Sequence, residues 1–141
     1  MAAKSSAQDI VESIFPAAGI DSDADLYFNK TVNTETMSLT EPTVIVFDPP
    51  SSGDQANSDT VIRDPSVQIT ITGAIANENN THYADAQQKF EQIVEFMYPS
   101  FSHTVGTTKY LGSVPGLNGF VENTEDNRPV WVANYTLTRT F

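Results

Sequence analysis

The chain has 141 residues, and 18 acidic residues against 7 basic ones give it a formal net charge of −11. It contains no cysteine, which excludes disulfide bonds and thiolate metal sites. No apolar run approaches the roughly 18 residues that a membrane-spanning helix needs, and the N-terminal segment lacks the apolar core of a secretion signal. We therefore expect one soluble domain over residues 1–141, made and used in a cytoplasm.

The acidic charge is the main compositional signal. The seven basic residues are scattered with no two adjacent, so the chain lacks the basic patch with which proteins neutralise nucleic-acid phosphates. Direct binding of nucleic acid is therefore not expected. An acidic surface by itself either keeps a protein soluble or reflects a saline habitat.

The first half of the chain predicts one helix, two strands and a long loop. The helix covers about residues 6–17, with apolar residues at helical spacing, a serine as its N-cap and a glycine after its end. Residues 26–29 are compatible with a short strand, and residues 43–47 are all β-branched or aromatic, as strands prefer. The polar segment 48–64 is rich in Pro, Ser and Gly, so we expect a long mobile loop there.

The second half of the chain has clearer periodicities. In residues 65–75 apolar side chains alternate with Gln and Thr, as in a half-buried strand. In residues 81–97 they recur every three or four residues along one side of a helix. This stripe consists of Tyr83, Ala86, Phe90, Ile93 and Met97. Residues 109–114 form a further strand candidate, and residues 119–123 and 130–140 flank an acidic turn and predict a hairpin.

Together these elements predict the fold class α+β, with a single antiparallel or mixed sheet of four or five strands and two helices packed on one face. Arg139 shares the parity of the apolar residues in the last strand. It therefore either pairs with a carboxylate at the sheet edge, reaches a neighbouring subunit or extends to water. Phe101, Tyr110 and Phe120 lie outside the clear patterns, and we expect them to pack in the core rather than meet a partner.

Several short sequence motifs occur in an order that is typical of one family. They are TVIVFD at 43–48, DPSVQITITG at 64–73, a helix that opens with Tyr83 and Ala86, and DNRPVWVANYTLTRTF at 126–141. This series resembles the tail terminator proteins of long-tailed bacteriophages, in which a strand PxVQIxxxG, a helix opening YxxA and a closing strand xxRPxxxxNxxxxR follow one another. The residues that match the closing strand are Arg128, Pro129, Asn134 and Arg139.

The resemblance implies a small α+β subunit that forms a homo-hexameric ring and catalyses no reaction. Such a ring caps the tail tube, ends tube growth and provides the joining surface to the head–tail connector or head-completion protein. The implied partners are other copies of the chain, the major tail tube protein and that connector, with no cofactor. Genomic DNA would pass through without specific binding, as an acidic wall allows. The implied location is the tail–neck junction of the virion, assembled in the host cytoplasm.

Candidate contacts with a neighbouring subunit or with the tube lie in the predicted loop and in the last strand. Long loops in compact domains usually carry function, and charged residues at a strand end can reach a neighbour. These candidates are Asp54, Asn57, Asp59, Arg63, Arg128, Arg139 and Phe141.

Two other functions stay open. A neck or head-completion protein of the same virion would also be small, acidic and ring-forming. A calcium-dependent binding module is suggested by Asp21, Asp23 and Asp25, because alternate acidic residues open calcium loops. However, Leu26 and Val32 stand where such a loop needs Gly and Glu, and a solvated turn explains the same residues.

An enzymatic function has no support in the sequence. The two histidines, His82 and His103, stand beside a helix start and in a predicted loop. No neighbouring residue in the sequence orients either ring, as general-base catalysis requires. We therefore expect surface imidazoles and no catalytic residues.

Overall fold

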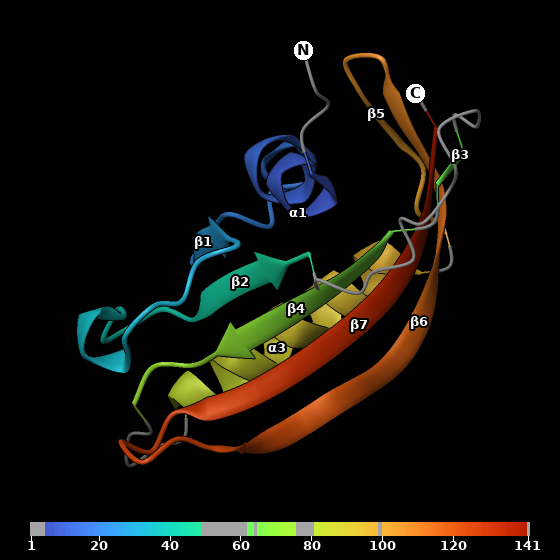
Figure 1. The fold of residues 1–141 in the computed structure, drawn as a ribbon. Coiled ribbons are helices and arrows are strands. Elements are labelled where there is room, and N and C mark those ends of the chain that lie inside the picture. Colours follow the sequence, from blue (N-terminus) through green and yellow to red (C-terminus); the bar gives the residue numbers. More distant parts are fainter. Residues whose placement is uncertain (1–4, 49–61, 64, 76–80, 99, 141) are drawn as a thin grey trace.

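The structure is a computed structural model that describes residues 5–48, 62–63, 65–75, 81–98 and 100–140. Over these residues the fold is α+β, with one mixed, curled sheet, two main helical segments and one short 3-10 turn (Figure 1). The helical elements are α1 (Ser6–Asp9), η1 (Ile10–Ile14), α2 (Phe15–Ala17), η2 (Thr34–Thr36) and α3 (Thr81–Met97). The strands are β1 (Asp25–Phe28), β2 (Thr43–Phe47), β3 (Ile62–Arg63), β4 (Ser66–Thr72), β5 (His103–Val105), β6 (Thr108–Asn123) and β7 (Pro129–Thr140).

The first helical segment consists of α1, η1 and α2, which together cover the residues 6–17 that the sequence predicts. Ser5 is its N-cap, because its Oγ accepts a hydrogen bond of 3.2 Å from the backbone N–H of Gln8. The middle turn is π-helical. Gly19 follows the end with a φ of +77°, a conformation that glycine adopts without strain.

Six strands of the sheet follow one another in the order β1-β2-β4-β7-β6-β5, and β3 pairs with β7 outside this path. β1 and β2 are parallel, whereas the other pairs are antiparallel. The sheet is therefore mixed, and it has more strands than the four or five that the sequence predicts. β3 and β5 have only two and three residues, too few to produce a recognisable alternation.

The predicted alternation of β4 and β7 is confirmed by burial. Their inward residues are buried and lie opposite one another in pairs, Val67 with Tyr135, Ile69 with Ala133, and Ile71 with Trp131. α3 lies along this face (Figure 1), and Ala86, Ile93 and Met97 of its predicted stripe are fully buried. The first helical segment joins the same core through Phe15, whose ring centroid lies 5.8 Å from that of Phe96.

The strand assignments for residues 109–114 and 119–123 are confirmed, but both ranges belong to the single strand β6, whose register with β7 shifts at three places. Pro115 and the glycines near it interrupt the apolar alternation, but bulges accommodate such residues inside a strand. His103, expected in a loop, lies in β5.

Candidate assembly surface

The outer edge of β6 is largely open. β6 pairs with β7 along one edge, but β5 covers only residues 108–110 of its other edge. No strand in the described part of the chain pairs with that edge at residues 111–123. Figure 1 shows this part of β6 at the outside of the sheet. Unpaired N–H and C=O groups on such an edge form a template for pairing with another chain.

Exposed apolar side chains accompany the open edge, and we call residues 111–121 the β6 stripe. Leu117 is 89% exposed, and the other exposed large residues of the stripe are Leu111, Val114, Phe120 and Val121. No residue of the stripe is charged, although the chain carries a formal charge of −11. Exposed apolar patches often mark interaction sites. The β6 stripe is therefore the best candidate for a binding surface.

A bulge in β6 directs Leu117 outward. Two residues of β6, Gly116 and Leu117, lie opposite the single residue Asn134 of β7. The backbone N–H of Asn134 donates a 2.9 Å hydrogen bond to Oδ1 of Asn118, and Nδ2 of Asn134 donates a 2.8 Å bond to the carbonyl of Leu117. Side chains thus supply bonds that the ladder loses at the bulge. Because bulges bend a strand and re-aim its side chains, these bonds set the direction of Leu117.

An aromatic cluster joins the stripe to the core. The Phe120 ring centroid lies 5.2 Å from that of Trp131 and 6.1 Å from that of Tyr83. Trp131 is buried, whereas Phe120 stays about half exposed. Core packing is therefore confirmed for Phe101 and Tyr110, which are both buried, and only in part for Phe120.

Three of the sequence motifs that carry the family resemblance contact one another at one point in the fold. Gly73 is the last residue of the motif at 64–73, Ala86 belongs to the motif that opens the helix, and Pro129 belongs to the motif at 126–141. The N–H of Gly73 donates a 2.8 Å hydrogen bond to the carbonyl of Pro129, and a β-carbon added to Gly73 would lie 2.9 Å from Cβ of Ala86. These residues therefore fix how β4, α3 and β7 approach one another.

Arg128, one of the candidate contacts, is 1% exposed. Its Nε donates a 2.9 Å hydrogen bond to Oδ2 of Asp126, and its Nη1 donates to the carbonyls of Ser38 at 3.0 Å and Gly73 at 3.3 Å. Hydrogen bonds from Thr124 and then from Arg128 lower the pKa of Asp126. Arg128 thus ties the β6–β7 turn to two other segments, and its burial is inconsistent with the predicted surface contact.

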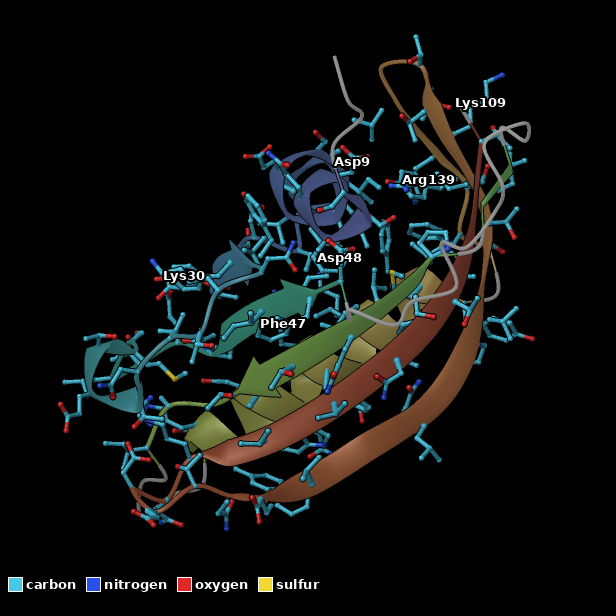
Figure 2. The ribbon with its side chains drawn as sticks, in the orientation of Figure 1. Asp9, Lys30, Phe47, Asp48, Lys109 and Arg139 are labelled. Carbon is cyan, nitrogen blue, oxygen red and sulfur yellow. The ribbon has the colours of Figure 1, made fainter. Side chains whose placement is uncertain are left out.

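Arg139 belongs to a buried polar group between the first helical segment and the hairpin. It is 5% exposed and lies opposite Tyr110 in the ladder. Oη of Tyr110 donates a 2.6 Å hydrogen bond to Oδ2 of Asp9, which is also buried. Figure 2 shows Arg139 directed from the end of β7 toward the helix that carries Asp9. This burial argues against extension of Arg139 to water.

The remaining candidate contacts come from the predicted loop and the C-terminus. The backbone of Arg63 pairs with that of Arg139 in the β3–β7 ladder, which brings these two candidates together. Nearly all of the predicted mobile loop 48–64 lies outside the described residues, so its mobility stays a prediction. Also outside them are Asp54, Asn57, Asp59 and Phe141.

Lys89 of α3 is a buried cation that the sequence pattern does not single out. Its Nζ donates hydrogen bonds to the carbonyls of Ile20 at 2.9 Å and Ser22 at 2.8 Å, and to Oε1 of Gln92 at 2.9 Å. An ammonium group has three donors, so all of them are used. Burial lowers the pKa of Lys89. Lys89 therefore links the turn after the first helical segment to α3.

Two of the three acidic residues that suggest a calcium loop, Asp21 and Asp23, lie near this lysine. Asp23, Asp21 and Glu41 raise the pKa of Lys89 against the larger effect of burial. A cleft of about 430 Å³ beside Lys89 is lined in part by Asp23, Glu41 and Asp85. In the described residues no group of three or more His, Cys, Asp or Glu side chains is arranged to hold a metal ion. The acidic cluster thus provides charge compensation for Lys89.

Both histidines take part in structural contacts. Nδ1 of His82 donates a 2.7 Å hydrogen bond to the carbonyl of Ile75, which lies beyond the end of β4. The ring of His103 lies 4.9 Å from that of Phe96 and 4.7 Å from that of Phe101, and burial lowers its pKa. The two rings thus support the packing around the ends of β4 and α3.

No helix within the described ranges is both long and apolar enough to cross a membrane. Models of known protein families give no match to the chain, and curated proteins give none either. Its function is therefore inferred from its own residues and their arrangement.

Proposed function

We propose that the chain is a structural virion protein, a tail terminator subunit of which six copies cap the phage tail tube as a ring. The observation that supports this best is the open edge of β6 with its uncharged, exposed apolar side chains. A ring subunit must offer its neighbour such a surface, whereas a protein that works alone is expected to protect it. The ring would end tube growth and provide the joining surface to the head connector.

The residues that carry the family resemblance support the same proposal. Gly73, Ala86 and Pro129 lie in contact, and Asn134 secures the bulge of the hairpin. The motifs that resemble the family therefore lie in one packed unit, as a shared fold would require. In this proposal the shared unit is a sheet of the four or five longer strands with both helices on one face, to which β3 and β5 are short additions.

The net charge agrees with a ring through which genomic DNA passes. Six acidic copies would surround the DNA with negative charge, and like charges prevent adhesion to the wall. The same charge opposes closure of the ring unless salt screens it. The Debye length falls from roughly 30 Å at about 0.01 M salt to roughly 8 Å at about 0.15 M. We therefore expect self-association to strengthen as salt rises.

Light scattering across this salt range, followed by electron microscopy of the assembled fraction, tests the proposal. We expect hexamer-sized particles with six-fold rotational averages at higher salt, and no complex with duplex DNA at any salt. Oligomers that dissociate when salt is added, or a DNA complex at low salt, would contradict the proposed role of the acidic surface.

Binding to isolated virion parts separates a tail terminator from a neck or head-completion protein. A terminator should bind the ends of preformed tail tubes and stop their further growth. Binding to filled heads, with no effect on tubes, would instead support a head-completion role.

A further inference from the structure

We infer that the β6 stripe binds a second copy of this chain head to tail, at the open edge of its sheet. This inference rests on the proposed function, which requires copies to meet, and it names the surface where they meet. The counterpart on the neighbouring copy is β1, at the other end of the sheet.

The backbone of β6 is prepared for pairing at residues 111–123, where no described strand covers its outer edge. Soluble proteins usually protect such edges with charged side chains, prolines or bulges. Here no charge lies between residues 110 and 121. Pro115 and the bulge at Gly116 and Leu117 divide the edge, and a further register shift lies between Phe120 and Glu122. The contact is therefore centred on the short stretch of residues 117–121.

The side chains at this centre form a shaped apolar surface. Leu117 projects from the bulge and is the most exposed large apolar residue in the described part of the chain. Beside it a hollow of about 310 Å³ is lined by Leu117, Phe120, Val121 and Val132, among others. A projecting leucine next to an apolar hollow suits a contact in which side chains of two molecules interdigitate.

The charge distribution favours another copy as the occupant. Two molecules that each carry a formal charge of −11 repel one another less strongly where at least one of the two contact surfaces lacks charge, and β1 itself contributes only Asp25. The neutral region extends beyond the β6 stripe, because residues 66–72 of β4 and 129–138 of β7 also contain no charged residue. A basic partner would instead be attracted to the acidic surface of the chain, because the β6 stripe carries no charge that could attract it.

The two ends of the sheet make a head-to-tail contact possible. In the described residues β1 pairs only with β2, so it leaves an open edge at the end opposite to β5 and β6. Contacts between unlike surfaces generate rings when the rotation closes, whereas contacts between like surfaces stop at a dimer. Pairing of β6 with β1 of the next copy therefore permits a ring, and pairing of β6 with β6 does not.

Leu117→Asp tests the surface, with Leu39→Asp as the matched control, because Leu39 is 67% exposed and lies outside the β6 stripe. We expect Leu117→Asp to raise the concentration needed for half-assembly at least about tenfold, as loss of a central interface residue does. Leu39→Asp should assemble like the unaltered protein. Equal assembly of both variants would overturn the inference, because Leu117 would then lie outside the contact. If both variants still formed rings, the proposed function would stand and only the contact surface would be wrong.

Cross-linking tests the head-to-tail arrangement, because the chain has no cysteine of its own. We expect a thiol cross-linker to join Leu117→Cys to Tyr27→Cys, a β1 variant, when the two are mixed, and to leave each variant alone uncoupled. Leu117→Cys that couples to itself and stops at dimers would overturn both the head-to-tail contact and the proposed ring. Caps that form on isolated tail tubes without any coupling between Leu117→Cys and Tyr27→Cys would overturn the inference alone and leave the proposed function standing.

Discussion

Gly73 and Pro129 lie so close together that a β-carbon added to the glycine would stand 2.8 Å from Cγ of the proline ring. The same β-carbon would also stand 2.9 Å from Cβ of Ala86. Side chains essentially never approach one another this closely. The start of β7 and the helix α3 therefore meet β4 at this point only because residue 73 has no side chain.

Gly73→Ala should destabilise the fold by about 1–3 kcal/mol, the usual cost of overpacking a tight site. Gly112→Ala is the control, because a β-carbon there meets nothing within 4 Å. Urea unfolding of the two variants provides the comparison. Equal midpoints would show that the contact between Gly73, Ala86 and Pro129 adjusts easily to a larger side chain and does not determine the packing.

Lys89→Met should cost about 1–3 kcal/mol, because the carbonyls of Ile20 and Ser22 lose their charged donor. Methionine retains most of the apolar stem of lysine, so lost packing contributes little. Lys109→Met is the control at an exposed position of β6. Thermal unfolding of both variants should show a clear loss only for Lys89→Met. A comparable loss in both would mean that the three hydrogen bonds of Lys89 make no net contribution to the stability of the fold.

The elements that the sequence predicts best are those in which one face is buried over many residues. β4, β7 and α3 are such elements, and their apolar periodicity reports their burial directly. β6 is different, because its outer part faces solvent and its bulges break the alternation. Asn134 of the neighbouring strand forms two hydrogen bonds with residues 117 and 118 at the bulge, and no pattern within β6 itself reveals this partner.

The buried polar residues were less predictable for a related reason. Lys89 stands three residues after Ala86 and four before Ile93, a spacing that places it on the buried side of α3. Its charge argues for exposure, and the carbonyls that satisfy it lie 67 to 69 residues away in the chain. Asp9 and its partner Tyr110 are likewise 101 residues apart. Only the tertiary structure brings such partners together.

Asn134→Ala should loosen the bulge that directs Leu117, because it removes the side-chain donor to the Leu117 carbonyl. We expect a loss of stability of about 0.5–1.5 kcal/mol, as for a single hydrogen bond. We also expect faster amide hydrogen exchange at residues 116–118 than in the unaltered protein. Thr138→Ala, on the same face of β7, is the control. Unchanged exchange at the bulge would show that the backbone bonds suffice to hold it.

Tyr110 provides a test of the buried polar group near the first helical segment. Burial, followed by the hydrogen bond to Asp9, raises its pKa to about 12 from the usual 10.0. Since the folded pKa lies above the unfolded one, the associated stabilisation is fully present below pH 10 and is lost as the pH rises through about 12. A shift of this size corresponds to about 2–3 kcal/mol.

Tyr110→Phe should therefore be less stable than the unaltered protein at neutral pH, because Asp9 loses a 2.6 Å hydrogen bond. Its free energy of unfolding should then fall less steeply between pH 10 and about 12, because the late-ionising hydroxyl is gone. Tyr98→Phe, at a half-exposed position, is the control and should keep the original slope. Urea unfolding at several alkaline pH values measures both slopes, and the difference in tyrosinate absorbance between the unaltered protein and Tyr110→Phe measures the pKa itself. A midpoint of that difference near pH 10 would show that Tyr110 is not held in a buried bond to Asp9.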